Sequence, residues 1–222
     1  MKKIISKVIP LYSVLPILLC VGANVLSFYG TRLFNTAMPH FSLEIAADRA
    51  VPFVPAFITV YIVAYAQWAL CYILIAREGR DFAYRYFSGL FLSKLLCAAV
   101  FIILPTAITR PEITGTDIFS RLTAMIYSAD APDNLFPSVH CLESVYFALV
   151  LLYSKKLPDW VKTLNAVFSL FVCASVVFVK QHFVLDIFGG AAVAFLSVFV
   201  ARGFRTERLF YLFLPKGTSF EN

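Results

Sequence analysis

Three short stretches of this sequence carry residue types that can do chemistry, and the last of them pairs an imidazole with a carboxylate. In Lys180–Asp186, the side chains of His182 and Asp186 are four residues apart, so on a helix they share a face. A carboxylate one turn away holds an imidazole in one tautomer and stabilises its cation, which leaves the other ring nitrogen free to attack. The alternative is a histidine at a membrane interface with an aspartate that caps the helix. An idle carboxylate inside hydrocarbon is costly, and this cost favours a functional role for Asp186.

The second stretch, Phe136–His140, has the pattern of a helix start. Ser138 is a good N-cap residue, and the free N–H groups of the first turn form an anion site. His140 in that turn is placed to donate a proton to whatever binds there. Glu143 lies three residues later, where it is predicted to orient His140 or to reach a headgroup; the alternative is an interfacial carboxylate.

Two cations accompany these motifs. One lies in the third stretch, Thr109–Pro111, and the other is Lys180, the first residue of the His182 stretch. Arg110 offers a planar fork that matches the oxygens of a phosphate. Lys180 is a second cation close to His182. The alternatives are a solvated loop arginine and a lysine that snorkels at a helix end.

The elements that must position these residues are predicted to be membrane-spanning helices. Of the 222 residues 60% are hydrophobic and only 14% are charged, which exceeds what a soluble domain of this size can bury. Six segments approach the length of about 20 apolar residues that a bilayer core requires of a helix, and the fourth is short if it starts at Ser138. They run approximately over Val8–Phe28, Pro52–Ala76, Tyr84–Leu104, Ser138–Tyr153, Trp160–Val179 and Phe183–Ala201. We therefore expect an all-α, six-helix transmembrane bundle that forms one domain over residues 1–222.

The basic residues predict how the bundle is oriented. With six spans, most of them fall on one side, which the positive-inside rule assigns to the cytoplasm. They are Lys2, Lys3, Lys7, Arg77, Arg80, Arg85, Lys155, Lys156, Arg202, Arg205, Arg208 and Lys216. Both termini are then cytoplasmic, in a plasma or inner membrane, and all three chemical stretches lie on the outer face. The net charge of +6 therefore reflects topology, and no nucleic-acid partner is expected. The five cysteines show no metal-ligand spacing and are predicted to be small buried residues.

In these motifs the chain resembles the type 2 phosphatidic acid phosphatase (PAP2) superfamily. That family carries Lys-x6-Arg-Pro, then Pro-Ser-Gly-His, then Ser-Arg-x5-His-x3-Asp. Here Arg110-Pro111, Pro137-Ser138-Val139-His140 and then Ser175, His182 and Asp186 follow the same order and spacing, with the motifs inside residues 109–190. The motifs Phe-Pro-Ser-x-His and Lys-Gln-His-x3-Asp are most similar to those of a branch that also resembles inositol phosphorylceramide and sphingomyelin synthases.

The resemblance implies a role for each matching residue. His182 is the nucleophile that becomes phosphorylated, and Asp186 is its partner. His140 protonates the leaving oxygen, while Arg110 and Ser138 hold the phosphate. The family needs neither a metal nor another cofactor.

Three positions depart from the family pattern. Ile103 stands where the family has its lysine, Val176 stands where it has an arginine, and Val139 replaces its glycine. Two cations are thus missing. Lys180 is the first candidate to replace one of them. Lys94, within the third span, is a second candidate, with a buried ion pair to a carboxylate of the fourth or sixth span as its alternative.

These features predict a membrane lipid-phosphate phosphatase that acts on a lipid phosphate or diphosphate through a phosphohistidine. Transfer of a phospho-headgroup to a lipid alcohol shares the same first step and stays open. A non-catalytic protein that binds an anionic lipid is a second class, supported by the missing cations. A small transporter is a third class, but it predicts broken helices near mid-membrane. The sequence leaves the oligomeric state open.

Overall fold

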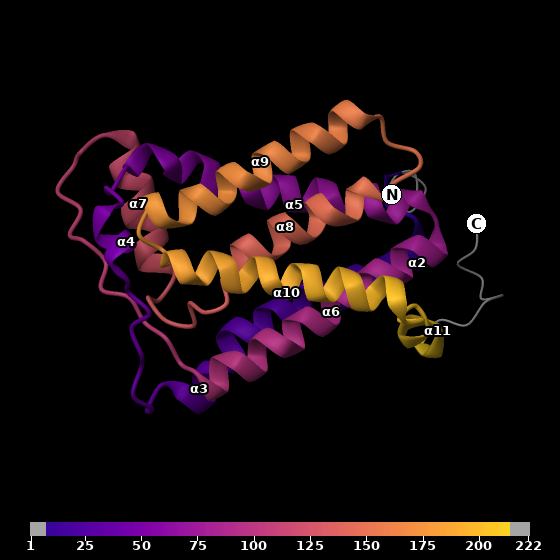
Figure 1. The fold of residues 1–222 in the computed structure, drawn as a ribbon, viewed down its shortest axis with the longest axis horizontal. Helices are drawn as coiled ribbons and strands as arrows, with labels where there is room; N and C mark the ends of the chain where they lie inside the picture. Colours follow the sequence, from indigo (N-terminus) through magenta and orange to yellow (C-terminus); the bar gives the residue numbers. More distant parts are fainter. Residues whose placement is uncertain (1–7, 214–222) are drawn as a thin grey trace.

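The computed structural model describes residues 8–213, and this part of the chain is a bundle of helices (Figure 1). The elements in chain order are α2 (Leu11–Val25), a π-helical turn η1 (Leu26–Gly30), α3 (Arg32–Asn35), α4 (Ala46–Ala50), a 3-10 turn η2 (Pro55–Phe57), α5 (Ile58–Glu78), α6 (Arg80–Ile103), α7 (Ile118–Ala129), α8 (Val139–Leu152), α9 (Asp159–Phe178), α10 (Val184–Gly203) and α11 (Arg208–Phe213). In these residues β-pairing is limited to two isolated bridges, Phe41 with Thr106 and Ala107 with Asp133. The all-α prediction is confirmed.

Five of the helical segments are long and apolar enough to cross a membrane. They are Leu11–Asn35, Pro55–Glu78, Arg80–Ile103, Asp159–Phe178 and Val184–Gly203. The predicted fourth span forms α8, which has only 14 residues. At 1.5 Å per residue such a helix is about 21 Å long, short of a hydrocarbon core of about 30 Å. The chain is therefore an integral membrane protein with five candidate spans, and α8 is a shorter apolar helix inside the bundle.

Helix α8 occupies the middle of the bundle, where it packs against α5, α6, α9 and α10 (Figure 1). Large apolar side chains such as Phe87, Leu90 and Phe147 are fully buried there. The outer faces of the long helices are also apolar, since Leu170 is 68% exposed and Phe199 is 69% exposed. A water-soluble bundle would carry polar residues at such positions, whereas lipid accepts these side chains.

The bundle has two different ends. At one end lie α4, α7 and the starts of α8 and α10, and we call it the site end (Figure 1). At the opposite end α2 begins, α5 turns into α6 and α11 follows α10. Gly79 makes the α5–α6 turn with a φ of +140°, a conformation that side chains rarely adopt. The predicted topology signals Lys2, Lys3, Lys7 and Lys216 lie outside the described residues.

Helices α8 and α10 touch through their backbones near the site end. A Cβ atom on Gly190 would lie 2.4 Å from the carbonyl oxygen of Ser138, so any larger residue would push the helices apart. In the same region the N–H of Ser138 donates to the carbonyl of Asp186 over 3.1 Å. These contacts bring together two motifs that are more than 40 residues apart in the sequence.

Candidate functional site

The start of α10 holds His182 through a carboxylate. His182 precedes the helix rather than lying on it, because α10 begins at Val184. Its Nδ1 atom nevertheless lies 3.3 Å from Oδ2 of Asp186, and the same oxygen accepts the N–H of Phe183 at 2.9 Å. Asp186 is fully buried and His182 is 8% exposed. With Nδ1 engaged, Nε2 is the nitrogen that remains for chemistry, and it has no hydrogen-bond partner in residues 8–213.

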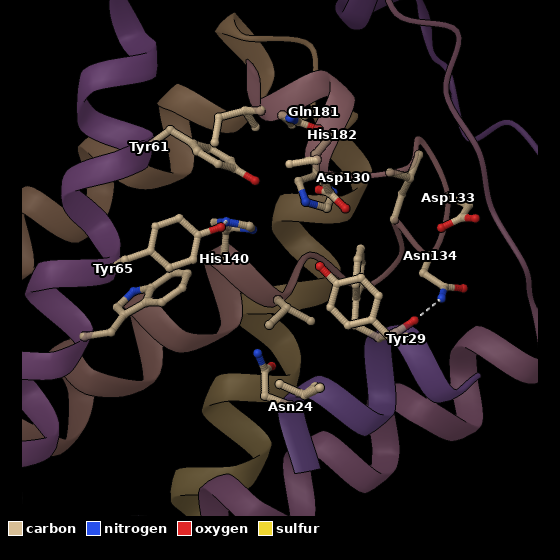
Figure 2. Close-up of a pocket in the computed structure, with 17 residues that line it drawn as sticks. Asn24, Tyr29, Tyr61, Tyr65, Asp130, Asp133, Asn134, His140, Gln181 and His182 are labelled. Atoms are coloured by element: carbon tan, nitrogen blue, oxygen red, sulfur yellow. Dashed lines mark hydrogen bonds between the residues drawn. The ribbon is translucent and has the colours of Figure 1, made fainter. Parts of the chain in front are cut away.

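The start of α8 holds His140 through aromatic rings instead. Tyr61 stacks on its imidazole with ring centroids 4.3 Å apart, and the centroid of Trp68 lies 5.2 Å away. The Tyr65 hydroxyl lies 3.2 Å from His140 Nε2. The three aromatic residues follow one another at intervals of four and three along α5, so they share a face. Figure 2 shows Tyr61 and Tyr65 on one side of a cavity, next to His140. The ring centroids of His140 and His182 are 6.0 Å apart.

Ser138 caps α8 as predicted, since its hydroxyl accepts the N–H of Cys141 at 3.3 Å. The N–H of Leu142 bonds to the carbonyl of Ser138, as in a regular first turn. The N–H groups of Val139 and His140 remain as the first-turn donors without an intrahelical acceptor. The end of α8 is thus able to donate hydrogen bonds to an anion.

Arg110 approaches the same place from the loop after α6, and it does so through Gln181. Its guanidinium donates to Oε1 of Gln181 and, at 2.6 Å, to the carbonyl of Asp130. Since arginine has no acceptor, the amide oxygen of Gln181 must face it, and the amide nitrogen must point the other way. That nitrogen is buried without a partner in the described chain, and Gln181 lines the cavity beside His182 (Figure 2). It is a free donor for a ligand, and no motif in the sequence predicts it.

Two carboxylates lie on the far side of His182 from the aromatic rings (Figure 2). Asp133 pairs with Arg32 at 2.8 Å. Asp130 lies 3.6 Å from Arg32 and 3.9 Å from Arg110, farther than the Asp133–Arg32 pair. Burial raises the pKa of Asp130 above its ordinary value of 3.8, although Arg110 and His182 act in the opposite direction. Both arginines are thus shared with acids before any ligand binds.

Both histidines, Gln181, the two carboxylates and the three aromatic rings of α5 line a cavity of about 260 Å³ between α2–η1 and α5. Val25 and Phe28 contribute apolar wall on the α2 side, and Tyr29 contributes a ring. A second cavity, of about 670 Å³, lies between the α4 region and the loop of Arg110, and its lining is more polar. His182 lines both cavities. Among residues 8–213 no three His, Cys, Asp or Glu side chains are grouped so that they could hold a metal ion.

A family model of the PAP2 superfamily matches residues 79–209. The chain belongs to the PAP2 superfamily. The match includes both histidine motifs, Arg110 and Gln181, while the aromatic residues of α5 lie before it. No curated protein and no solved structure gives a significant match, so the synthase-like branch remains a prediction.

The positions where the chain departs from the PAP2 pattern are not equivalent in space. Ile103, at the end of α6, is 78% exposed. Val176 is fully buried in α9, and its carbonyl accepts the N–H groups of both Gln181 and His182. The backbone at Val176 therefore still positions the loop that carries His182, although its side chain carries no charge. Ser175, next to it, donates to the carbonyl of Val172 and so serves its own helix.

Lys180 does not reach the cavity of the histidines in this structure. Its ammonium donates to the carbonyls of Asp48 and Val51, at 2.9 and 2.6 Å, and thereby ties the α4 segment to the loop before α10. It lines the second cavity, as Arg110 does. A phosphate-binding role for Lys180 remains a prediction, and it requires the lysine to leave these carbonyls.

Lys94 and Glu143 form an ion pair at 2.7 Å inside the bundle, with exposed side-chain fractions of 0% and 4%. This is the alternative that the sequence analysis gave for Lys94. Separating such a pair leaves a buried charge without a partner, so the pair ties α6 to α8. In this structure Glu143 is therefore engaged away from His140.

Proposed function

We propose that the chain is a lipid-phosphate phosphatase that works through a phosphohistidine at His182 and needs no metal. PAP2 membership supports a reaction of the phosphatase or phosphotransferase type. The observation that carries the proposal is the pairing of His182 Nδ1 with Asp186, which leaves Nε2 free beside the cavity that His140 also lines. An imidazole held in this way is both oriented and stabilised as it gains positive charge.

The reaction then has two steps. His182 Nε2 attacks the phosphorus, the bond from phosphorus to the alcohol oxygen breaks, and His140 provides the proton for that oxygen. Water next attacks the phosphohistidine, the N–P bond breaks, and His140 accepts the proton of the water. The free amide of Gln181 and the first N–H groups of α8 stabilise the charge on the equatorial oxygens, and Arg110, which lines the second cavity, acts through Gln181.

The substrate is a phosphate or diphosphate ester of a lipid, because the cavity lies within a bundle of apolar helices and is partly walled by apolar side chains. The charge distribution supports a site on the non-cytoplasmic face. Within the described chain, the ends of the long helices opposite the site end carry Arg77, Arg80, Arg85, Arg202, Arg205 and Arg208. Such clusters mark the cytoplasmic side of a membrane protein. Both termini lie on that side if α8, although shorter than a full span, counts as the sixth crossing.

Transfer to a lipid alcohol is the second candidate, because the apolar wall formed by Val25 and Phe28 also suits a membrane-bound acceptor. The first step is the same, so the two reactions separate only when the phosphohistidine is consumed. A protein that only binds anionic lipids would stop before the first step.

The deciding experiment traps the intermediate. Purified protein in EDTA is incubated with lipid phosphates and diphosphates that carry a ³²P label, then quenched, and acid-labile, base-stable label on the protein is measured. Free phosphate and labelled lipid product are quantified with and without an acceptor lipid. We expect label on wild-type protein, none on His182→Ala, and release of free phosphate.

His40→Ala is the matched control, because His40 is the third histidine of the chain and should keep the label. Labelled lipid in place of free phosphate would establish the transferase. Turnover that persists in His182→Ala would end the phosphohistidine proposal. Lipid binding without label or turnover across the panel would favour the binding protein.

A further inference from the structure

Tyr65 is the one hydroxyl in the described chain that contacts the imidazole of His140. Its side chain is on α5, it is 49% exposed, and it lines the same cavity as both histidines. Figure 2 shows its oxygen directed at the ring of His140. A tyrosine hydroxyl both donates and accepts a hydrogen bond, so it can take up one proton while it releases another.

The nitrogen that contacts Tyr65 is Nε2, at 3.2 Å. The ring of His140 has little freedom to turn away, because Tyr61 stacks on one side of it and Trp68 lies against it. Trp68 is itself fixed, since its indole N–H donates to the hydroxyl of Ser144 at 3.0 Å. A proton on Nε2 of His140 therefore meets the oxygen of Tyr65 first.

We propose that Tyr65 carries the proton between His140 and the oxygen of the substrate, an inference that rests on the phosphatase proposal above. In the first step the Tyr65 O–H proton goes to the departing alcohol oxygen as its bond to phosphorus breaks. His140 enters this step as the imidazolium, and its Nε2 proton moves to the Tyr65 oxygen at the same time, so the hydroxyl is restored and His140 becomes neutral. In the second step the water proton goes to Tyr65 and the hydroxyl proton returns to His140.

This relay predicts which substrates depend on Tyr65. An alkyl alcohol leaves poorly as an alkoxide and needs the proton, whereas p-nitrophenolate leaves without one. A tyrosine that only held the ring of His140 in place would matter equally for the two leaving groups.

The experiment compares Tyr65→Phe with wild type on a lipid alkyl phosphate and on p-nitrophenyl phosphate, with release of the alcohol measured in single turnovers. General acids contribute on the order of 10²-fold or more to rate, so we expect at least about a 10-fold loss on the alkyl ester. Release of p-nitrophenolate should change by less than about 2-fold, well below that general-acid contribution. Equal losses on both esters, or no loss on either, would overturn the relay.

Two further variants make the result specific. Tyr29→Phe removes a hydroxyl from the other wall of the cavity and should leave the ratio of the two rates unchanged. Adding Tyr65→Phe to His140→Ala should cost nothing more on the alkyl ester, because groups that act as a unit are not additive. A full additional loss in that background would show that Tyr65 acts independently of His140.

Failure of the relay and failure of the phosphatase proposal can be told apart. If His182→Ala still releases alcohol from either ester, the phosphohistidine is wrong. If His182→Ala is inactive while Tyr65→Phe shows no preference between the esters, only the relay is wrong.

Discussion

The two histidines of the site have the same side chain but are held by opposite kinds of neighbour. His182 precedes α10 and contacts a buried carboxylate through Nδ1. His140 lies in the first turn of α8 and contacts the rings of Tyr61 and Trp68. A carboxylate stabilises an imidazole that becomes positive, whereas aromatic packing fixes its position and supplies no negative charge. In the proposed mechanism the neighbours, rather than the residue type, thus distinguish the nucleophile from the proton carrier.

The largest effect is expected where the carboxylate is removed. Asp186→Asn keeps the shape of the side chain but loses its charge, so the turnover number should fall on the order of 10³-fold to 10⁴-fold, as in other His–Asp pairs. The measurement is phosphate release together with trapping of the labelled protein. Asp159→Asn, whose carboxylate is 94% exposed, serves as the control. Near-normal turnover in Asp186→Asn would show that the histidine does not need the acid.

The next effect concerns the free donor beside His182. Gln181→Leu removes the amide, and loss of one donor to a developing oxyanion typically costs about 10²-fold in rate. Gln181→Glu keeps an acceptor for Arg110 but puts an acceptor where the free N–H group was, so it should lose at least as much. Steady-state kinetics on a lipid phosphate measures both variants. If Gln181→Glu retained activity, the role of Gln181 would be limited to holding Arg110.

A smaller effect is expected on the aromatic side. Tyr61→Leu keeps an apolar side chain but removes the ring stacked on His140. Aromatic pairs contribute about 0.5–1.5 kcal/mol beyond burial, so a rate loss of roughly 2-fold to 12-fold follows if all of this positions His140. The rate of alcohol release is the observable. If Tyr61→Leu lowered the rate as much as Asp186→Asn does, the aromatic neighbour of His140 would matter as much as the carboxylate neighbour of His182.

The sequence was sufficient for the parts of the site that follow from local rules. A serine after a proline predicts an N-cap, and the four-residue spacing of His182 and Asp186 predicts their contact, although His182 lies outside the helix. The contacts of the α5 aromatic rings with His140 could not be predicted. Tyr61, Tyr65 and Trp68 occur in a helix that is apolar on all sides, where a ring that faces a histidine looks like a ring that faces lipid.

Side-chain direction was the second limit. The sequence Lys180-Gln181 does not predict that the lysine side chain points toward the α4 segment while the glutamine amide points toward the cavity. The length of α8 was a third limit, because its apolar stretch is shorter than a bilayer requires and its ends depend on its neighbours. The ion pair of Lys94 was predicted as an alternative, because a charge inside a membrane bundle needs a partner.

The smallest effect tests whether every acid near His182 behaves like Asp186. The pKa of Asp130 is raised by burial, so the folded protein favours its neutral form. As pH rises past the ordinary value of 3.8, the unfolded chain ionises first and wild type loses stability until the raised pKa is passed. Asp130→Asn lacks this loss, so its Tm relative to wild type should rise over that range.

Thermal unfolding of the purified protein from about pH 4 to pH 7, the range in which a raised carboxyl pKa acts, measures this difference. Glu112→Gln, at an exposed position, is the control and should follow wild type. A Tm difference for Asp130→Asn that falls with rising pH would mean that Arg32 and Arg110 dominate over burial.

The backbone contact at Gly190 divides the molecule into a part that is fixed and a part that can be exchanged. A glycine against a carbonyl sets the spacing of the two histidine motifs through the backbones of α8 and α10. The apolar wall of Val25 and Phe28 lies before the segment that matches the family, while both histidines lie within it. Exchanging that wall, with Tyr61, Tyr65 and Trp68 of α5 left in place, therefore offers a route to new lipid preferences that keeps the proposed reaction centre intact.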